Sequence, residues 1–237
     1  MNNSINLPII AYLHSPYREK FGIPRQPNLV QVQSRIEMLA PYHNPLAFDG
    51  IAHFSHLWLI WQFHENKNQH QQQFRPQIRP PRLGGNQKIG VFASRSMYRP
   101  APIGLSVVRF IAIEQDHQGK LSLIVEGADL LDGTPIIDIK PYLAYADSIE
   151  NAQSGYAQQQ PPVKAVIWQD KTLKTHLITS QHVLARHIDE LEQILSLDPR
   201  PAYQHDPKRI YAMSFANMDV QFCIDDKRVF IVGLSII

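Results

Sequence analysis

The 237-residue sequence contains one cysteine and no apolar run long enough to cross a membrane. A single cysteine excludes an intrachain disulfide, and Cys223 lies between Phe222 and Ile224 in an alternating apolar segment, which is typical of a small, half-buried hydrophobic residue. A membrane helix needs about 18 consecutive apolar residues. Residues 1–8 contain no Lys or Arg ahead of an apolar stretch, so a signal peptide is not expected either. These absences predict a cytoplasmic protein without a membrane anchor.

Several motifs that would define a common enzyme class are also absent. The sequence has no Gly-x-Gly-x-x-Gly, no Gly-x-x-x-x-Gly-Lys-Ser/Thr and no Gly-x-Ser-x-Gly. Eleven histidines suggest a metal site, and His53, His56 and His64 have the nearest approach to ligand spacing. However, positions 53 and 56 of a strand point to opposite faces, and no His-Glu-x-x-His or Cys-x-x-Cys accompanies them. We therefore expect no bound metal, and a metal hydrolase is the weaker alternative.

Acidic residues are missing from one long segment. Residues 66–113 contain eight Lys and Arg and no Asp or Glu, so the rest of the chain carries the acidic excess. Within this segment Arg75, Arg79 and Arg82 alternate with prolines, which prevent a helix and favour an extended loop. Arginines on such a loop can present planar guanidinium groups to phosphates. The segment predicts a surface that binds a polyanion. In the alternative, its arginines form ion pairs with the acidic residues of 114–150 and have only a structural role.

Short β-type runs dominate the first 130 residues. They cover residues 8–13, 54–63, 89–93, 105–113 and 121–125, and residues 115–119 are expected to form a hairpin loop. No helical pattern alternates with these runs, so we predict a mostly β fold with an antiparallel or mixed barrel. The Gly-, Gln- and Pro-rich residues 154–162 indicate a boundary between a barrel domain at 1–160 and a second domain at 161–237.

The second domain has a different pattern. Residues 181–196 place apolar side chains at helical 3-4 spacing and are followed by Asp198 and Pro199, which predicts one amphipathic helix. Three β-type runs follow, at residues 209–215, 219–224 and 229–233. We therefore predict a small α/β domain in which one helix packs on a three-stranded sheet.

Two tracts, residues 90–104 and 132–142, combine small residues, prolines and charged groups directly after apolar strands. Their charged residues include Arg95, Arg99, Asp132, Asp138 and Lys140. Charged groups among apolar neighbours destabilise a fold unless they pair or bind a ligand. Either tract alone could be a structural turn, but together they predict a ligand site.

Six segments match the motifs of one known family. They are residues 24–27 (PRQP), 54–58 (FSHLW), 79–86 (RPPRLGGN), 90–104, 129–142 (DLLDGTPIIDIKPY) and 198–203 (DPRPAY). In these segments the chain resembles the TsaA-like (TrmO) tRNA methyltransferases, although Ala101 stands where that family usually has Asn. The resemblance implies a single-sheeted β-barrel catalytic domain, a homodimer, and S-adenosylmethionine as methyl donor. The implied acceptor is the exocyclic amine of threonylcarbamoyladenosine at the tRNA position 3′ of the anticodon.

The resemblance also implies which residues contact the donor. They are Gln26, Pro27, Asn28, His64, Glu65, Arg95, Leu105, Asp132, Gly133, Thr134 and Pro135. Several of these contacts are expected to be made by the backbone.

Methyl transfer sets further expectations. A sulfonium donor is already reactive, so the enzyme must mainly align donor and acceptor and exclude water. The acceptor nitrogen carries a carbamoyl group and is a poor nucleophile, which favours a base near its N–H. Asp138 is the predicted base with Lys140 as its partner, unless the two form only a structural ion pair. Arg75, Arg79 and Arg82 are predicted to hold the tRNA backbone. A non-catalytic RNA-binding module is the alternative function.

Overall fold

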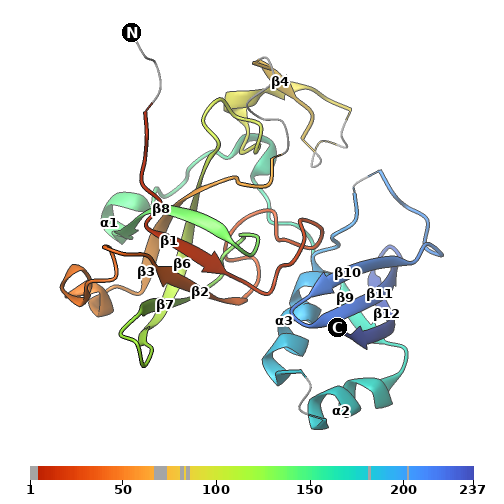
Figure 1. The fold of residues 1–237 in the computed structure, drawn as a ribbon. Coiled ribbons are helices and arrows are strands. Elements are labelled where there is room, and N and C mark those ends of the chain that lie inside the picture. The colour runs from red at the N-terminus through yellow and green to blue at the C-terminus, as the bar shows by residue number, and fades with distance from the viewer. Residues whose placement is uncertain (1–4, 67–73, 81–82, 84–85, 181–182, 202) are drawn as a thin grey trace.

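The computed structural model describes residues 5–66, 74–80, 83, 86–180, 183–201 and 203–237. Six antiparallel strands close into a barrel in the order β1-β2-β7-β6-β3-β8 (Figure 1). These strands are β1 Ala11–His14, β2 Gln33–Met38, β3 His56–Gln62, β6 Ile103–Gln115, β7 Leu121–Glu126 and β8 Thr134–Pro141. The predicted mostly β fold with a single-sheeted barrel is confirmed.

Alternation of buried and exposed side chains explains the strands that were predicted correctly. In β3 the buried Leu57, Leu59 and Trp61 point into the barrel, and the residues between them lie on the outer face. Two of the six barrel strands, β2 and β8, are not among the predicted strands. Prolines and charged residues interrupt the apolar pattern of the β8 segment and favour a loop. In the structure the prolines lie near the strand ends, and the charged side chains lie on the half-exposed outer face of the strand. Long-range pairing with β1 and β3 keeps this segment extended.

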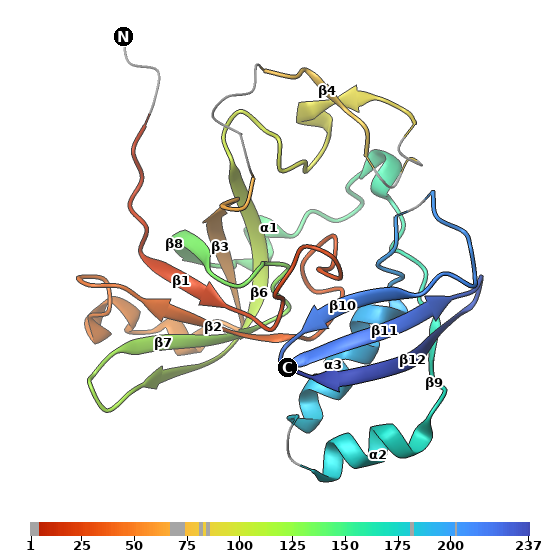
Figure 2. The same ribbon diagram turned by 45° about the vertical axis from the view of Figure 1, so that its right-hand side comes forward.

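The predicted strand at 89–93 is mostly wrong. Only Ile89–Gly90 (β5) is extended, and it pairs with β4, Gln77–Ile78. The next residues form a 3-10 turn, η5 Val91–Ala93. We call residues 74–99 the basic arm, and its described part projects away from the barrel in Figures 1 and 2.

The C-terminal domain contains a four-stranded sheet in the order β10-β11-β12-β9. Its elements are β9 Ala165–Trp168, α2 Lys171–Thr179, α3 Ala185–Ser196, β10 Tyr211–Phe215, β11 Met218–Ile224 and β12 Arg228–Ile236. The α/β class is confirmed, but the predicted three strands and one helix omitted β9 and α2. The parallel pairing of β9 with β12 joins residues about 60 apart, and no local pattern predicts it. The predicted helix begins at Ala185 instead of residue 181.

Short helices fill the connections. They are η1 Pro45–Phe48, η2 Ile51–His53, α1 Ala144–Asp147 and η6 Gly155–Ala157. The predicted domain boundary after residue 160 falls between η6 and β9. No helix in the described part of the chain is long and apolar enough to span a membrane.

The connection between β1 and β2, residues 15–32, packs against the C-terminal domain. Tyr17 forms an isolated bridge with Phe215, and the Phe21 ring stacks on Phe222 with centroids 6.2 Å apart. Val30 belongs to the same hydrophobic core as the C-terminal sheet and α3. Figure 2 shows the connection beside β10. The C-terminal domain therefore supports a segment that also carries Gln26, Pro27 and Asn28.

Candidate functional site

Residues 26–28 lie beside β6 and contact the basic arm. Arg95 Nη1 donates a hydrogen bond of 2.5 Å to Gln26 Oε1. Asn28 Nδ2 donates one of 2.8 Å to the carbonyl of Val107. The backbone of Asn28 is left-handed, with φ 61°, a conformation that asparagine tolerates better than most residues. The structure thus brings Gln26, Asn28 and Arg95 into one group, with Pro27 between the first two.

The outer face of β6 forms a second side of this group. Leu105 and Val107 are two residues apart and point to the same face of the strand. The Leu105 side chain is exposed there. Close contact between Asn28 and the barrel requires Gly127, because a Cβ at that position would lie 2.3 Å from Asn28 Oδ1. Gly127 also has φ 86°, which disfavours any side chain.

His64 and Glu65 follow β3 and are exposed. The Lys20 ammonium donates a hydrogen bond to the Glu65 carbonyl, which ties this segment to the 15–32 connection. The adjacent Asn66 donates one of 2.9 Å to the carbonyl of Met97, which ties it to the basic arm. The His64–Glu65 pair is therefore attached to the two segments that carry Gln26 and Arg95.

The turn before β8 is fixed largely by its own side chains. Asp132 Oδ1 accepts a 3.0 Å hydrogen bond from the Ser15 N–H and lies 3.6 Å from His14 Nδ1, and about half of the Asp132 side chain is exposed. Thr134 is buried, and its hydroxyl donates to the Leu131 carbonyl at 2.6 Å. Gly133 donates its N–H to the Leu13 carbonyl, and Pro135 is buried. Only the Asp132 side chain in this turn is therefore well exposed to a ligand.

Asp129 is a half-buried carboxylate in the matched 129–142 motif and is not among the predicted site residues. Ser106 Oγ donates to Asp129 Oδ1 at 2.6 Å, and Trp61 Nε1 donates to Ser106 Oγ at 3.0 Å. Loss of hydration raises the pKa of Asp129 to about 6, while the Ser106 hydrogen bond and the charge of Arg95 oppose that rise. A carboxylate held at this pKa beside Arg95 is the kind of group found at binding and catalytic sites.

Asp138 lies on the outer face of the barrel, two strands from Leu105, because Ile60 of β3 pairs with Asp138 on one side and with Leu105 on the other. Its carboxylate is 2.9 Å from the Lys140 ammonium and also accepts the N–H of Ile139. The pair is on the outer face of β8, and Asp138 stands four residues beyond Thr134, or about 13 Å along an extended strand. The structure does not bring Asp138 together with Arg95 or Asp129 through any contact among the described residues.

Two family models match the chain in consecutive stretches. The tRNA-methyltransferase O N-terminal domain matches residues 12–148, which include the barrel and the basic arm. The TrmO C-terminal domain matches residues 154–237. The chain belongs to the TrmO family.

Relatives in the TrmO family resemble the chain over nearly its full length. The Escherichia coli (strain K12) tRNA (adenine(37)-N6)-methyltransferase is 37% identical over 94% of this chain and 95% of its own. A Pseudomonas aeruginosa protein, provisionally named an S-adenosylmethionine-dependent methyltransferase, is 41% identical over 90% of each chain. The crystal structure of TrmO from Pseudomonas aeruginosa superposes with a TM-score of 0.77 at 33% identity and covers 98% of both chains.

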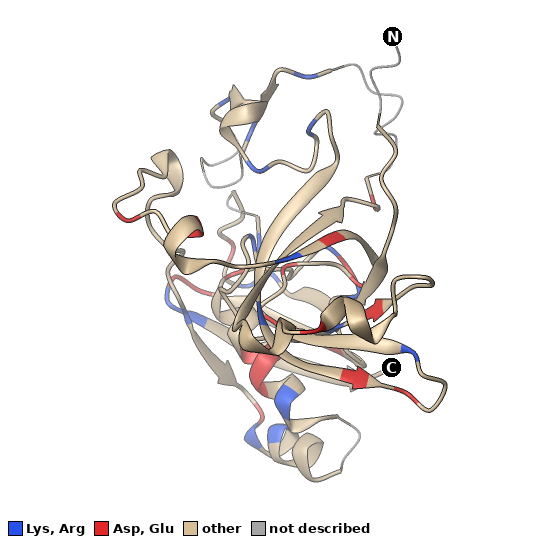
Figure 3. Cartoon of the chain, turned by 90° about the vertical axis from the view of Figure 1, so that its left-hand side faces the viewer, with Lys and Arg blue, Asp and Glu red and all other residues tan. Residues whose placement is uncertain are grey.

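The basic arm of this TrmO-family chain contains Lys and Arg residues and no Asp or Glu of its own. Figure 3 shows Lys and Arg on the described part of the arm and acidic residues only elsewhere. Arg75 and Arg79 are exposed, and neither forms an ion pair with a carboxylate among the described residues. Arg82 lies outside the described residues. The arrangement does not support the alternative in which Arg75 and Arg79 pair with acidic residues of 114–150.

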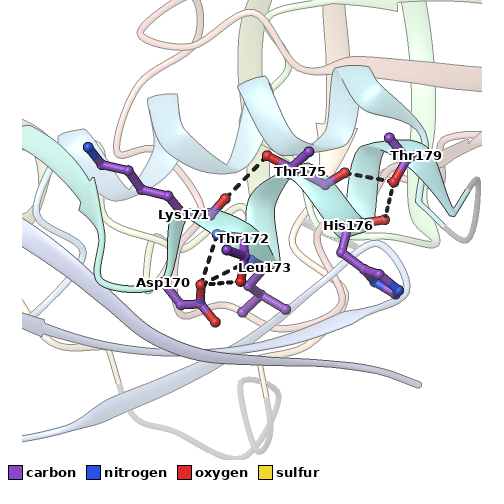
Figure 4. Close-up of a pocket in the computed structure, with 7 residues that line it drawn as sticks. All are labelled: Asp170, Lys171, Thr172, Leu173, Thr175, His176 and Thr179. Carbon is purple, nitrogen blue, oxygen red and sulfur yellow. Dashed lines mark hydrogen bonds between the residues drawn. The ribbon is translucent and has the colours of Figure 1, made fainter.

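Neither a hollow in the C-terminal domain nor a metal-binding cluster marks a second site among the described residues of this TrmO-family fold. A hollow of about 640 Å³ lies along α2 of the C-terminal domain (Figure 4). Its carboxylate, Asp170, accepts hydrogen bonds from the Thr172 hydroxyl and from the N–H groups of Thr172 and Leu173. These bonds cap the helix and lower the pKa of Asp170. In the described part of the chain, no group of three His, Cys, Asp or Glu residues is placed to hold a metal ion.

Proposed function

We propose that the chain transfers a methyl group from S-adenosylmethionine to the exocyclic N6 amine of adenine in tRNA. The observation that carries this proposal is the group formed by Gln26, Asn28, Arg95 and Asp129 in a chain of the TrmO family. The named relatives supply the reaction type, because one is a tRNA (adenine(37)-N6)-methyltransferase. The finer substrate is threonylcarbamoyladenosine at the position 3′ of the anticodon, and the proposed compartment is the cytoplasm, where tRNA is found.

The charges of the group suit the donor. S-adenosylmethionine has one carboxylate and two cationic centres, an ammonium and a sulfonium. Arg95 can bind the carboxylate, and the Asp129 carboxylate can face a cationic centre. Both are fixed before the donor arrives, Arg95 by Gln26 and Asp129 by Ser106. Such preorganisation lowers the entropy lost on binding and aligns the donor.

The chemistry assigned to the chain is mainly positioning. When bound, S-adenosylmethionine supplies an electrophilic methyl group on its sulfonium. Residues 26–28, His64–Glu65, Leu105 and the 132–135 turn are proposed to hold the donor. The role of Asp138 as base stays a prediction, because its pairing with Lys140 equally suits a structural ion pair. The homodimer that the resemblance implies also stays a prediction.

The proposed activity has a direct test. Unmodified and threonylcarbamoylated tRNA would be incubated with the protein and methyl-labelled S-adenosylmethionine, then digested to nucleosides and analysed by mass spectrometry. We expect the label on the base N6 of threonylcarbamoyladenosine. Label on ordinary adenosine would keep the reaction and change the substrate. No label in either RNA, with tRNA binding intact, would favour a non-catalytic RNA-binding module.

The basic arm should set the salt dependence of tRNA binding. Replacing Arg75 and Arg79 by alanine should weaken binding similarly for different tRNAs and flatten the plot of log affinity against log salt concentration. Each phosphate contact contributes about 0.7–0.9 to that slope, so the double variant should lose about 1.4–1.8 units. Filter binding at several salt concentrations measures it. Lys171→Ala, an exposed charge on α2, is the matched control. An unchanged slope together with a lower melting temperature would mean that these arginines stabilise the fold instead.

A further inference from the structure

Three large aromatic side chains are exposed on the basic arm, Phe74, Phe92 and Tyr98, and the first two contact each other. Phe74 is 60% exposed and Phe92 is 69% exposed. Their rings are stacked on each other, with centroids 6.3 Å apart and planes inclined by 29°. Neighbouring exposed aromatic rings usually mark a contact surface, because they leave apolar area in water.

The backbone of the basic arm holds the two rings in place. Phe74 precedes β4 and Phe92 follows β5, so the pairing of these strands brings both rings to the same end of the hairpin. The Val91 N–H donates to the Pro76 carbonyl at 2.9 Å and extends that pairing. Arg99 donates to the Ser94 carbonyl at 2.6 Å, and its guanidinium carbon lies 5.7 Å from the centre of the Phe92 ring.

The charge around the rings indicates the ligand. An apolar protein partner would gain little from the Lys and Arg residues that surround the rings, and these charges would repel each other across a contact between two copies. An unpaired RNA loop satisfies both features, because its phosphates meet the basic residues while an unstacked base meets an aromatic face. The same 91–99 segment contains Arg95, which contacts Gln26 in the donor group.

We propose that Phe74 and Phe92 form a stacking platform for an unpaired nucleobase of the RNA substrate, adjacent to the methyl-donor site. The assignment of that RNA as the anticodon loop of tRNA rests on the proposed function. The base continues the ring stack, and Arg75 and Arg79 hold the neighbouring phosphates. The platform thereby favours RNA whose target loop is open and single-stranded.

Three substitutions of Phe92 test the platform. An anticodon stem-loop RNA with 2-aminopurine in its loop would be titrated with each protein, since stacking quenches 2-aminopurine fluorescence. Phe92→Ala and Phe92→Leu should each weaken binding about tenfold or more and reduce the quenching, because neither side chain has a π face. Phe92→Trp should keep both. The salt slope should stay unchanged, in contrast to the arginine variants. Tyr145→Ala, which removes an 88% exposed ring on α1, is the control.

The outcomes separate this proposal from the proposed function. Binding that is retained by Phe92→Leu and lost only by Phe92→Ala would indicate a merely apolar contact and overturn the platform. A change of association state in Phe92→Ala, measured by sedimentation, would show a contact between copies and also overturn it. If the wild-type protein methylates tRNA while all three variants bind RNA equally, only the platform fails. If aromatic-dependent quenching occurs without methyl transfer, the platform stands and the proposed function fails.

Discussion

Replacing Asp129 by asparagine should make the protein more stable and, at the same time, a weaker binder of S-adenosylmethionine. The pKa of this carboxyl is raised from 3.8 to about 6 by burial, so at pH 7 it is charged against the preference of its surroundings. Asparagine removes the charge but can still accept the Ser106 hydrogen bond. The relief should be roughly 1–3 kcal/mol in the free energy of unfolding. If Asp129 faces the donor as proposed, the loss of its charge should weaken binding at least about tenfold.

The gain in stability from Asp129→Asn should depend on pH. Because the folded-state pKa lies above the unfolded one, the Asp129 carboxylate destabilises the fold above about pH 6, and this destabilisation is lost as pH falls toward 4. The two proteins should therefore differ most at pH 7–8 and converge near pH 4. Donor affinity of the wild-type protein should fall as pH drops through 6, whereas that of Asp129→Asn should change little. Calorimetric titrations and melting curves across this pH range measure both quantities.

Glu190→Gln is the matched control for Asp129→Asn. Glu190 is buried on α3, accepts the Gln33 N–H at 3.0 Å, and has a pKa raised by burial to about 7. Its replacement should also stabilise the protein but leave donor affinity unchanged, because it lies outside the donor group. Equal donor affinity in Asp129→Asn and the wild type would remove Asp129 from the site.

Residues close in sequence were easier to predict than contacts made by the fold. The alternation in β3 and the 3-4 spacing in α3 are local patterns, and both elements are present, although α3 begins four residues later than predicted. The extended conformation of β8 depends on pairing with β1 and β3, which lie far away in the sequence. The charged residues on its outer face interrupt the apolar pattern that would predict a strand. The connection of residues 15–32, in which Asn28 has a left-handed backbone, likewise shows no periodic pattern.

The candidate site shows the same limit. The matched motifs indicated Gln26 and Arg95 separately, but the hydrogen bond that joins them spans 69 residues. Asp129 was visible in a motif, yet its raised pKa arises from burial beside the barrel, which the sequence does not show. The charge of the basic arm was readable, because the absence of acidic residues is a property of the sequence itself. The stacking of Phe74 on Phe92 depends on the pairing of β4 with β5.

Gly104→Ala should destabilise the barrel by more than the addition of a methyl group at a buried position with room for it. The same change should also weaken donor binding. A Cβ at this position would lie 2.3 Å from two atoms of the Trp61 indole, which faces Gly104 across the β3–β6 pair. Overpacking a core usually costs about 1–3 kcal/mol, and displacement of the indole would also break the chain of hydrogen bonds from Trp61 through Ser106 to Asp129. We therefore expect a loss near the upper end of that range in urea unfolding, together with reduced donor affinity by calorimetry.

The cause of the Gly104→Ala effect can be isolated with a second change and a control. Trp61→Phe removes part of the clashing indole, so the double variant should be more stable than the sum of the two single losses predicts. Gly90→Ala is the control, because Gly90 has φ −59° and a Cβ there would meet no atom within 4 Å. It should unfold at the wild-type urea concentration or slightly above it. Additive losses in the double variant would mean that the indole is not what excludes a side chain at position 104. The proposed path from Gly104 through Trp61 to Asp129 would then be wrong.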